Sequence, residues 1–354
     1  MRLTVLNVSY PLAPVSASTA GGAEQILLAL DEALVRTGNR SLVIAPDGSK
    51  THGLLLPTSG VRKHLTEEAK QRARVEHAKA IEHALQTFPI DVVHLHGIDF
   101  LSYLPRAGVP VIVTLHLPPD WYPKSVFQLE RSDTYLVCVS QSQRKACPPG
   151  ADIAAIVTNG TAVGEVLNRK KGNYLLSLGR ICPEKGFHSA IDAADRVGLP
   201  LYLAGHVFDY PEHRTYFEAE IRPRLRPPHR LLGPVGEEQK RHLLAGARCL
   251  LIPSTAQETS SLVAMEALAS GTPVVAYRNG ALPEIIDHGS TGFLVESAKE
   301  MAKAIFETPA LDPGACIRTA AARFSNTRMV ASYFDLYERA VSRQLQLEEA
   351  EVVC

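Results

Sequence analysis

Two glutamates, Glu258 and Glu266, stand eight positions apart around a short run of hydroxyl residues. The run, Thr259–Ser261, lies where a helix predicted over residues 261–270 should begin. Carboxylates accept hydrogen bonds from vicinal hydroxyls, and the first N–H groups of a helix have no partner within it. The segment is therefore typical of a sugar or phosphate site. Alternatively, Glu258 is a cap and Glu266 a solvated residue, but the apolar neighbours of Glu266 argue against this.

Two cations, Arg180 and Lys185, lie five residues apart in the segment Leu178–Gly186. Arg180 follows a predicted strand, and Lys185 precedes a predicted helix. Ligands of parallel sheets bind at the carboxyl ends of the strands, so we expect the two side chains to straddle a diphosphate. Taken alone they could be solvated surface charges, but the glycine and proline pattern around them favours a binding loop.

Gly21 and Gly22 separate the first predicted strand from the first predicted helix. They could let backbone N–H groups approach an anionic ligand, or they could serve only as a flexible connection. His116 ends a strand just before two prolines, and we expect it at the ligand-binding edge of its sheet. His94 and His96 lie on one strand; we expect them to be structural and to point to opposite faces.

Apolar strands alternate with helical patterns along the chain, which implies parallel sheets with helices on both faces. The predicted strands are Leu3–Val8, Ser41–Ala45, Asp91–His96, Val109–His116, Thr134–Ser140, Tyr174–Leu178, Pro200–Ala204, Arg230–Leu232, Ala247–Ile252, Thr272–Ala276 and Gly292–Val295. The predicted helices cover residues 23–37, 67–87, 187–197, 237–246, 261–270 and 298–307, with a last helix from Met329. The fold class is therefore α/β.

A length of 354 residues suggests two domains. We place one over residues 1–165 and the other over residues 172–328, joined near the polar stretch 164–173. Residues 329–354 form a helix and an acidic tail, which we expect to be frayed after Leu345. The aromatic stripe of this helix, which includes Tyr333, Phe334 and Tyr337, should belong to the core.

The composition excludes several classes of protein. Lys plus Arg equals Asp plus Glu at 37 each, so a general nucleic-acid binder is not expected. The six scattered cysteines contain no Cys-x-x-Cys pair, which favours free thiols in a reducing cytoplasm. No apolar run resembles a signal peptide or a membrane span. The motifs G-x-G-x-x-G, Walker A and Asp-x-Asp are all missing, so neither a dinucleotide nor a bound metal is expected.

Taken together, these residues resemble the retaining, nucleotide-sugar-dependent glycosyltransferases of family 4. Glu258 and Glu266 match the family's E-x7-E motif, and Leu178–Gly186 matches its G-R-x-x-x-x-K-G element. Further matching segments are Gly21-Gly22, Val157–Gly160, Gly271–Val275, Pro283–Ile286 and Gly289–Val295. The resemblance spans nearly the whole chain and implies the GT-B fold, in which two Rossmann-like domains face each other and a C-terminal helix crosses back to the N-terminal domain.

The resemblance also implies roles for single residues. The catalytic set would be Glu258 at the donor sugar, Arg180 and Lys185 at the diphosphate, and His116 reaching the sugar from the N-terminal domain. Glu266 would bind the ribose, and the rest of the donor site would comprise Gly21, Gly22, Thr259, Ser260, Ser261, Leu262 and Val263. Family members usually have Gly-Phe-Gly where this chain has Thr259–Ser261, a change that adds hydroxyls beside the sugar.

The resemblance predicts a cytoplasmic, metal-independent, retaining hexosyltransferase of carbohydrate biosynthesis that needs no cofactor. Its C-terminal domain would bind a nucleotide-diphosphate sugar, a UDP-sugar, and its N-terminal domain an acceptor hydroxyl on a sugar, a lipid-linked sugar or a small molecule. We expect Glu258 to find its partners in the bound sugar and not in a salt bridge. The alternatives are a non-catalytic nucleotide-sugar-binding protein and a sugar-nucleotide epimerase of the same architecture, which the E-x7-E spacing disfavours.

A cluster of basic residues raises the question of an anionic lipid or polymer partner. The cluster comprises Arg62, Lys63, Lys70, Arg72 and Arg74. Glutamates are interspersed among these cations, which favours a solvated helix face. The sequence therefore gives no support to peripheral membrane contact.

Overall fold

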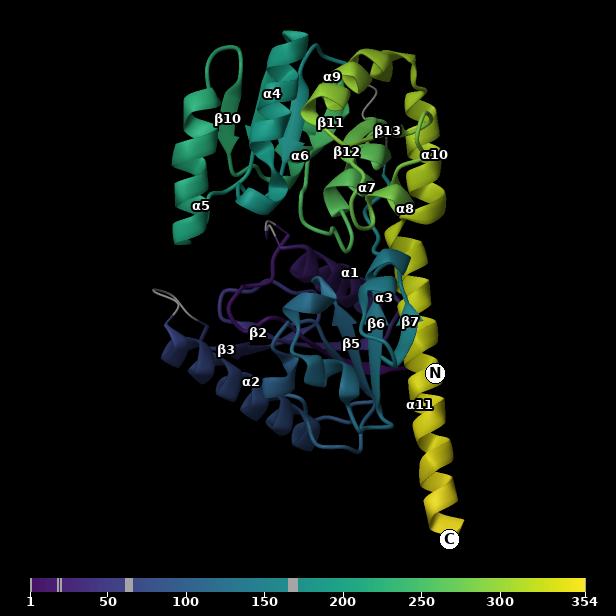
Figure 1. Cartoon of the computed structure of the whole chain (residues 1–354). Coiled ribbons are helices and arrows are strands. Elements are labelled where there is room, and N and C mark those ends of the chain that lie inside the picture. Colours follow the sequence, from purple (N-terminus) through teal and green to yellow (C-terminus); the bar gives the residue numbers. More distant parts are fainter. Residues whose placement is uncertain (1, 18, 20, 61–65, 165–170, 354) are drawn as a thin grey trace. The chain divides into compact units, whose positions relative to one another are not determined.

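The computed structural model describes residues 2–17, 19, 21–60, 66–164 and 171–353, the last ten of these by their backbone alone. The chain divides into two compact units (Figure 1). Unit 1 comprises residues 1–158 together with 327–354, and unit 2 comprises residues 159–326. The C-terminal helix therefore belongs to the same unit as the N-terminal sheet.

Unit 1 is built on a parallel sheet with the strand order β3-β2-β1-β4-β5-β6-β7. Its strands are β1 (Thr4–Val8), β2 (Arg40–Pro46), β3 (Leu54–Thr58), β4 (Val92–Leu95), β5 (Val111–Leu115), β6 (Thr134–Cys138) and β7 (Ile153–Ile156). Its α-helices are α1 (Gly22–Arg36), α2 (Glu67–Thr87), α3 (Gln141–Ala146) and α11 (Asn326–Val353).

Unit 2 repeats this plan with the strand order β10-β9-β8-β11-β12-β13, again parallel throughout. Its strands are β8 (Leu175–Leu178), β9 (Leu201–Ala204), β10 (Arg230–Gly233), β11 (Cys249–Ile252), β12 (Val274–Tyr277) and β13 (Gly292–Val295). Its α-helices are α4 (Phe187–Val197), α5 (Pro211–Tyr216), α6 (Glu237–Gly246), α7 (Leu262–Ala269), α8 (Leu282–Ile285), α9 (Ala298–Glu307) and α10 (Pro313–Arg323).

Each sheet is covered on both faces, as the apolar strands imply. In β8, Leu175 packs into a core with α4 and α9, whereas the next residue, Leu176, packs into a second core with α7 and α10. Successive side chains of a strand point to opposite faces, so one buried strand serves two cores. The predicted α/β class, with two parallel sheets, is confirmed.

Several elements were missing from the sequence-based prediction. Strands β3 and β7 lie at the two edges of the first sheet, and their apolar runs are short, that of β3 ending at Pro57. Helix α5 is short, and α10 has a weak apolar stripe. The last helix begins at Asn326 and continues to Val353, so the expected frayed tail is helical.

Tyr333 and Tyr337 of α11 are fully buried in unit 1, as their helical spacing indicated. Two basic residues of α2 are paired: Lys70 lies 2.6 Å from Glu67, and Arg74 lies 2.9 Å from Asp99. Arg62 and Lys63 lie outside the described residues. Among the residues that the structure does describe, no helix combines the length and the apolar character needed to cross a bilayer.

Candidate functional site

The order of strands in unit 2 reverses between β8 and β11, which pair side by side in parallel. Loops that leave two such neighbouring strands at their carboxyl ends diverge to opposite faces of the sheet, and ligands of open α/β sheets bind in the crevice between them. The loop after β8 carries Arg180 and Lys185, and the loop after β11 carries Glu258. The topology therefore places both sequence-predicted segments at one switch point.

The loop after β8 makes a tight turn that its glycines allow. Arg180 is exposed, and Lys185 ends a 3-10 turn that runs from Pro183 to Lys185. Gly186 has φ +63°, and a Cβ at this position would lie 2.2 Å from the carbonyl oxygen of Pro253. Any side chain at position 186 would thus push the loop after β8 away from the loop after β11.

Backbone hydrogen bonds join the two loops directly. The carbonyl oxygen of Glu184 accepts from the Thr255 N–H at 2.8 Å and from the Ser254 hydroxyl at 3.1 Å. From the next strand, the Asn279 amide donates to the carbonyl oxygens of Thr255, at 2.8 Å, and Ala256, at 2.9 Å. The sequence analysis missed Asn279, although its Asn-Gly pair is a recognisable turn signal.

Lys185 and Glu258 form an ion pair, with Lys185 Nζ 2.5 Å from Glu258 Oε1. The Glu258 side chain is 9% exposed and the Lys185 side chain 28% exposed. The expectation that Glu258 would avoid a salt bridge was wrong. A buried carboxylate needs a partner, and Lys185 supplies it.

The backbone at Glu258 is held by Gly280, which has φ +54°. A Cβ on Gly280 would lie 2.3 Å from the Glu258 carbonyl oxygen, and the next residue, Ala281, donates its N–H to that oxygen at 2.7 Å. This close approach fixes the point from which the Glu258 carboxylate projects. Nothing in the local sequence around Glu258 signals it, because the contact comes from a different loop.

Helix α7 begins at Leu262, one residue later than predicted. Its N-cap is Ser261, whose side chain makes no capping hydrogen bond, and the half-buried Thr259 precedes it in the loop. The buried hydroxyl of Ser260 has no hydrogen-bond partner. Leu262 and Val263 occupy the first two positions of the helix, where N–H groups lack intrahelical acceptors. The start of α7 therefore offers uncommitted hydrogen-bonding groups next to Glu258.

Glu266 lies in the second turn of α7 and pairs with Lys240 of α6 at 2.7 Å. The two side chains are only 14% and 15% exposed, and Lys240 also contacts Glu237 at 2.8 Å. Burial raises the pKa of Glu266, although Lys240 opposes the rise. The same carboxylates raise the pKa of Lys240 against its own burial. Glu266 is thus a buried, paired carboxylate, as its apolar neighbours predicted.

Unit 1 has its own switch point, between β1 and β4. Gly21 is the N-cap of α1, and Gly22 is its first residue. A Cβ on Gly21 would lie 1.8 Å from Oε2 of Glu24, so the glycine makes room for this carboxylate at the helix start. Glu24 is 7% exposed, and burial raises its pKa. In this structure a carboxylate of the chain itself occupies the space where an anionic ligand was expected.

His116 follows β5 in unit 1, and its Nε2 lies 3.0 Å from Nδ1 of His96. The two rings are stacked with centroids 5.3 Å apart, and burial lowers the pKa of His116 to about 3. The rings of His94 and His96 are only 4.0 Å apart, so the prediction that they point to opposite faces was wrong. Residues two apart on a strand share a face.

The histidines continue into a buried polar network. His94 Nδ1 lies 2.8 Å from the Tyr337 hydroxyl, and His94 Nε2 lies 2.8 Å from Thr114 Oγ1. The Thr114 hydroxyl in turn lies 2.8 Å from the hydroxyl of Tyr333. These bonds tie α11 to β4 and β5, and they give His94 the structural role that the sequence analysis expected.

Comparisons with known proteins agree with this arrangement. The family of "Glycosyltransferase Family 4" matches residues 20–155, and that of "Glycosyl transferases group 1" matches residues 172–308, so together they span more than half of the chain. A D-inositol 3-phosphate glycosyltransferase of Corynebacterium efficiens is 31% identical over 161 residues. That alignment spans 42% of this chain but only 38% of the relative's own length.

Among solved structures, AviGT4, a glycosyltransferase involved in avilamycin A biosynthesis, is 25% identical with a TM-score of 0.72. The match covers 96% of this chain and 98% of AviGT4. HepE of Anabaena, solved with UDP-glucose, has the same TM-score of 0.72 at 19% identity and covers 94% of this chain and 100% of HepE. The two parallel sheets, the matched families and these folds agree, and the chain belongs to the family 4 glycosyltransferases of the GT-B fold.

Proposed function

We propose that the chain transfers a hexose from a nucleotide-diphosphate sugar to an acceptor hydroxyl, with retention at the anomeric carbon and without a metal ion. The observation that carries this proposal is the ion pair between Lys185 and Glu258 at the switch point of unit 2, beside the start of α7. The pair brings a cation that can bind a diphosphate into hydrogen-bond contact with a carboxylate that can bind a sugar.

In this proposal, binding of the donor breaks the ion pair between Lys185 and Glu258 and gives each residue a new partner. Lys185 turns to the diphosphate together with the exposed Arg180, and Glu258 is released to accept hydrogen bonds from the sugar hydroxyls. The uncommitted Ser260 hydroxyl and the first N–H groups of α7 support a cradle for the sugar and phosphate. Glu266 binds the ribose hydroxyls while Lys240 balances its charge.

Two cations and a helix N-terminus can stabilise the charge that develops on the leaving diphosphate, which removes the need for Mg²⁺. The acceptor attacks on the face from which the diphosphate departs, and a phosphate oxygen takes the acceptor proton. Glu258 stabilises positive charge at the anomeric carbon. His116 is a neutral imidazole at physiological pH because burial lowers its pKa to about 3, so its proposed role is a hydrogen bond to the sugar and not a charge.

The donor nucleoside proposed is uridine, as in the UDP-glucose bound by HepE. We expect the donor sugar to differ from that of enzymes with Gly-Phe-Gly at this position, because Thr259, Ser260 and Ser261 bring hydroxyl groups next to the sugar. The proposed compartment is the cytoplasm. The five described cysteines, Cys138, Cys147, Cys182, Cys249 and Cys316, are all free, which supports a reducing environment.

Incubation with a panel of UDP-, GDP- and ADP-sugars and a panel of hydroxyl acceptors tests the proposal. The expected result is stoichiometric release of nucleoside diphosphate and a glycosidic product whose anomeric configuration equals that of the donor. Tight donor binding without product across the panel would instead identify a non-catalytic nucleotide-sugar-binding protein. Conversion of the donor without transfer would identify an epimerase.

A further inference from the structure

Three potential metal ligands meet beside the loop that carries Arg180 and Lys185. Cys182 and Glu184 belong to this loop, and His213 belongs to α5. One ligand atom from each residue lies within 4.8 Å of the other two. Cys182 is 1% exposed and His213 is 8% exposed. The residues come from segments about thirty positions apart, so the sequence alone does not reveal the cluster.

Two polar atoms of this cluster are buried without a hydrogen-bond partner. They are Oε2 of Glu184 and Nδ1 of His213. The Cys182 sulfur makes only weak contacts, with the Arg180 carbonyl oxygen at 3.6 Å and with the Glu184 side chain. Buried polar atoms are rarely left unpaired, because each loses its hydrogen bonds to water without compensation. Two such atoms in one cluster of ligand-type side chains indicate a binding site.

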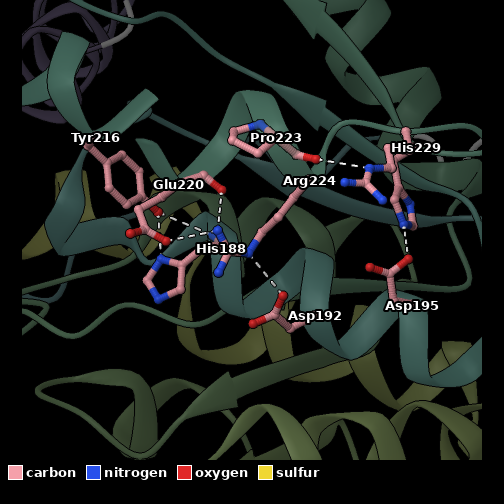
Figure 2. A network of polar contacts seen from close by, with 9 residues as sticks. His188, Asp192, Asp195, Tyr216, Glu220, Pro223, Arg224 and His229 are labelled. Atoms are coloured by element: carbon pink, nitrogen blue, oxygen red, sulfur yellow. Dashed lines mark hydrogen bonds and ion pairs between the residues drawn. The ribbon is translucent and has the colours of Figure 1, made fainter. Parts of the chain in front are cut away.

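The surrounding structure holds the three residues in place. Figure 2 shows the polar network that ties α5 and the segment after it to α4: the Tyr216 hydroxyl lies 2.9 Å from Nδ1 of His188, and Arg224 pairs with Asp192 at 3.1 Å. Tyr216 lies three residues after His213, so this network fixes the helix turn that presents the imidazole. On the other side, the Glu184 backbone is anchored by Thr255 and Ser254.

We propose that Cys182, Glu184 and His213 bind one divalent cation of the zinc class, with water in the fourth position. Thiolate, imidazole and carboxylate are the three ligand types of zinc sites, and soft sulfur together with nitrogen selects zinc over magnesium or calcium. A thiolate and a carboxylate carry two negative charges, which balance the cation although Arg180 is nearby. The three ligand atoms must move closer together to reach the separations of a tetrahedral zinc site.

Binding of the cation displaces one proton. Burial raises the pKa of the Cys182 thiol to about 11, with a smaller contribution from its hydrogen bond to Glu184. The thiol therefore gives its proton to solvent when the sulfur–metal bond forms, as metal-bound thiols do. Burial lowers the pKa of His213, so the imidazole is already in the neutral form that binds metals. No oxidation or other bond change is involved.

The proposed cation has a structural role and does not act as a Lewis acid on the donor. It joins α5 to the turn between Cys182 and Lys185, and so it restrains the backbone on which Arg180 and Lys185 stand. The ion pair between Lys185 and Glu258 uses neither Cys182 nor His213. Metal occupancy can therefore be measured without any assay of sugar transfer.

Titration of the chelator-treated, full-length chain with Co²⁺, followed by displacement with Zn²⁺, tests the proposal. We expect saturation at one equivalent, with a thiolate-to-cobalt charge-transfer band that Zn²⁺ removes. Cys182→Ala should abolish the band. His213→Ala should weaken binding by at least about 10²-fold, since even groups that only support a ligand cost 10- to 100-fold.

Cys316→Ala is the matched control, because Cys316 is equally buried but lies in α10 and outside the cluster. This variant should keep the band and the affinity. Circular dichroism establishes that each variant is folded; if Cys182→Ala is not, Glu184→Gln and His213→Ala carry the test. The proposal is overturned if no saturable band forms, if the band survives in Cys182→Ala, or if the substitutions at positions 184 and 213 leave the affinity unchanged.

Discussion

The carboxyl ends of the two sheets are built on the same topology but filled with different chemistry. In unit 2 the switch point is occupied by the ion pair Lys185–Glu258, and close by Lys240 pairs with Glu266. In unit 1 the corresponding edge holds the stacked imidazoles of His96 and His116. One edge carries charges, and the other carries neutral aromatic groups.

From this difference we expect the charged site of unit 2 to serve mainly function and the buried network of unit 1 to serve mainly stability. The Lys185 side chain is partly exposed, so its ion pair with Glu258 can open when a ligand offers better partners. The network of His94, Thr114, Tyr333 and Tyr337 is sealed from water, so breaking any bond in it leaves a buried polar group unpaired. Substitutions in unit 2 should therefore act on turnover, and protonation of unit 1 should act on folding.

The largest effect is expected from the diphosphate cations. Arg180→Ala or Lys185→Ala should lower turnover by about 10²–10³-fold, which corresponds to roughly 2.7–4 kcal/mol, if each side chain stabilises charge on the leaving group. Arg180 is exposed, so urea unfolding of Arg180→Ala should remain close to that of the parent, whereas Lys185→Ala leaves the buried Glu258 carboxylate unpaired and should also unfold at lower urea. Steady-state kinetics with saturating acceptor measure the loss, and Arg278→Ala, an exposed arginine that pairs with Glu296, is the control. Near-normal transfer by either variant would remove that residue from the mechanism.

The two glutamates should differ in which kinetic constant they change. Glu258→Gln should lower kcat by about 10²-fold, because the lost charge faces a centre that becomes positive only in the transition state. Glu266→Gln should mainly raise the donor KM, because bonds to the ribose change little during the reaction. Donor titrations of both variants decide between the roles. If Glu266→Gln lost kcat at unchanged KM while Glu258→Gln raised KM, the two positions would have to be exchanged.

Acid should destabilise unit 1 through its buried histidines. Burial lowers the pKa of His77 to about 4 and that of His116 to about 3, and it lowers the pKa values of His94 and His96 as well. The unfolded chain, with histidine pKa values near 6.5, then binds more protons than the fold. Stability is therefore full above pH 6.5 and falls as the pH drops toward the folded pKa values, by about 2 kcal/mol per neutral histidine between pH 8 and pH 5.

Trp121, the single tryptophan of the chain, lies in unit 1 and reports the unfolding of that unit by its fluorescence. Urea midpoints at pH 8 and pH 5 measure the effect. His116→Gln should reduce the pH dependence by about one histidine's share, whereas His83→Gln, at an exposed position of α2, should leave it unchanged. Equal midpoints for the parent at the two pH values would show that these rings are protonated in the fold.

The smallest effect is expected from removal of Mg²⁺ or Mn²⁺. If Arg180 and Lys185 neutralise the diphosphate, transfer should persist in excess EDTA, both in the parent and in Cys182→Ala. The variant separates the zinc-class site proposed in unit 2 from the reaction centre. Loss of transfer in EDTA with rescue by Mg²⁺ would mean that a divalent cation, and not the two side chains, neutralises the leaving group.

The sequence alone was informative about elements and motifs. Apolar runs mark buried strands and a period of 3.6 residues marks amphipathic helices, so β1, α2 and α4 were found almost to the residue. The pairs Glu258–Glu266 and Arg180–Lys185 are also local in the sequence. They follow predicted strands, so the sequence alone placed both pairs near strand ends. Edge strands such as β3 were missed because their apolar runs are short: that of β3 covers three leucines and ends at Pro57.

The tertiary structure decided which distant residues contact one another. Lys185 and Glu258 are 73 positions apart, and His94 and Tyr337 are 243 apart. Whether such residues meet depends on the order of strands in a sheet and on which unit receives the last helix, and neither is written in a local period. The sequence therefore determined which residues could bind a diphosphate sugar, while the packing of distant segments decided that Glu258 pairs with a cation and that Cys182, Glu184 and His213 form a cluster.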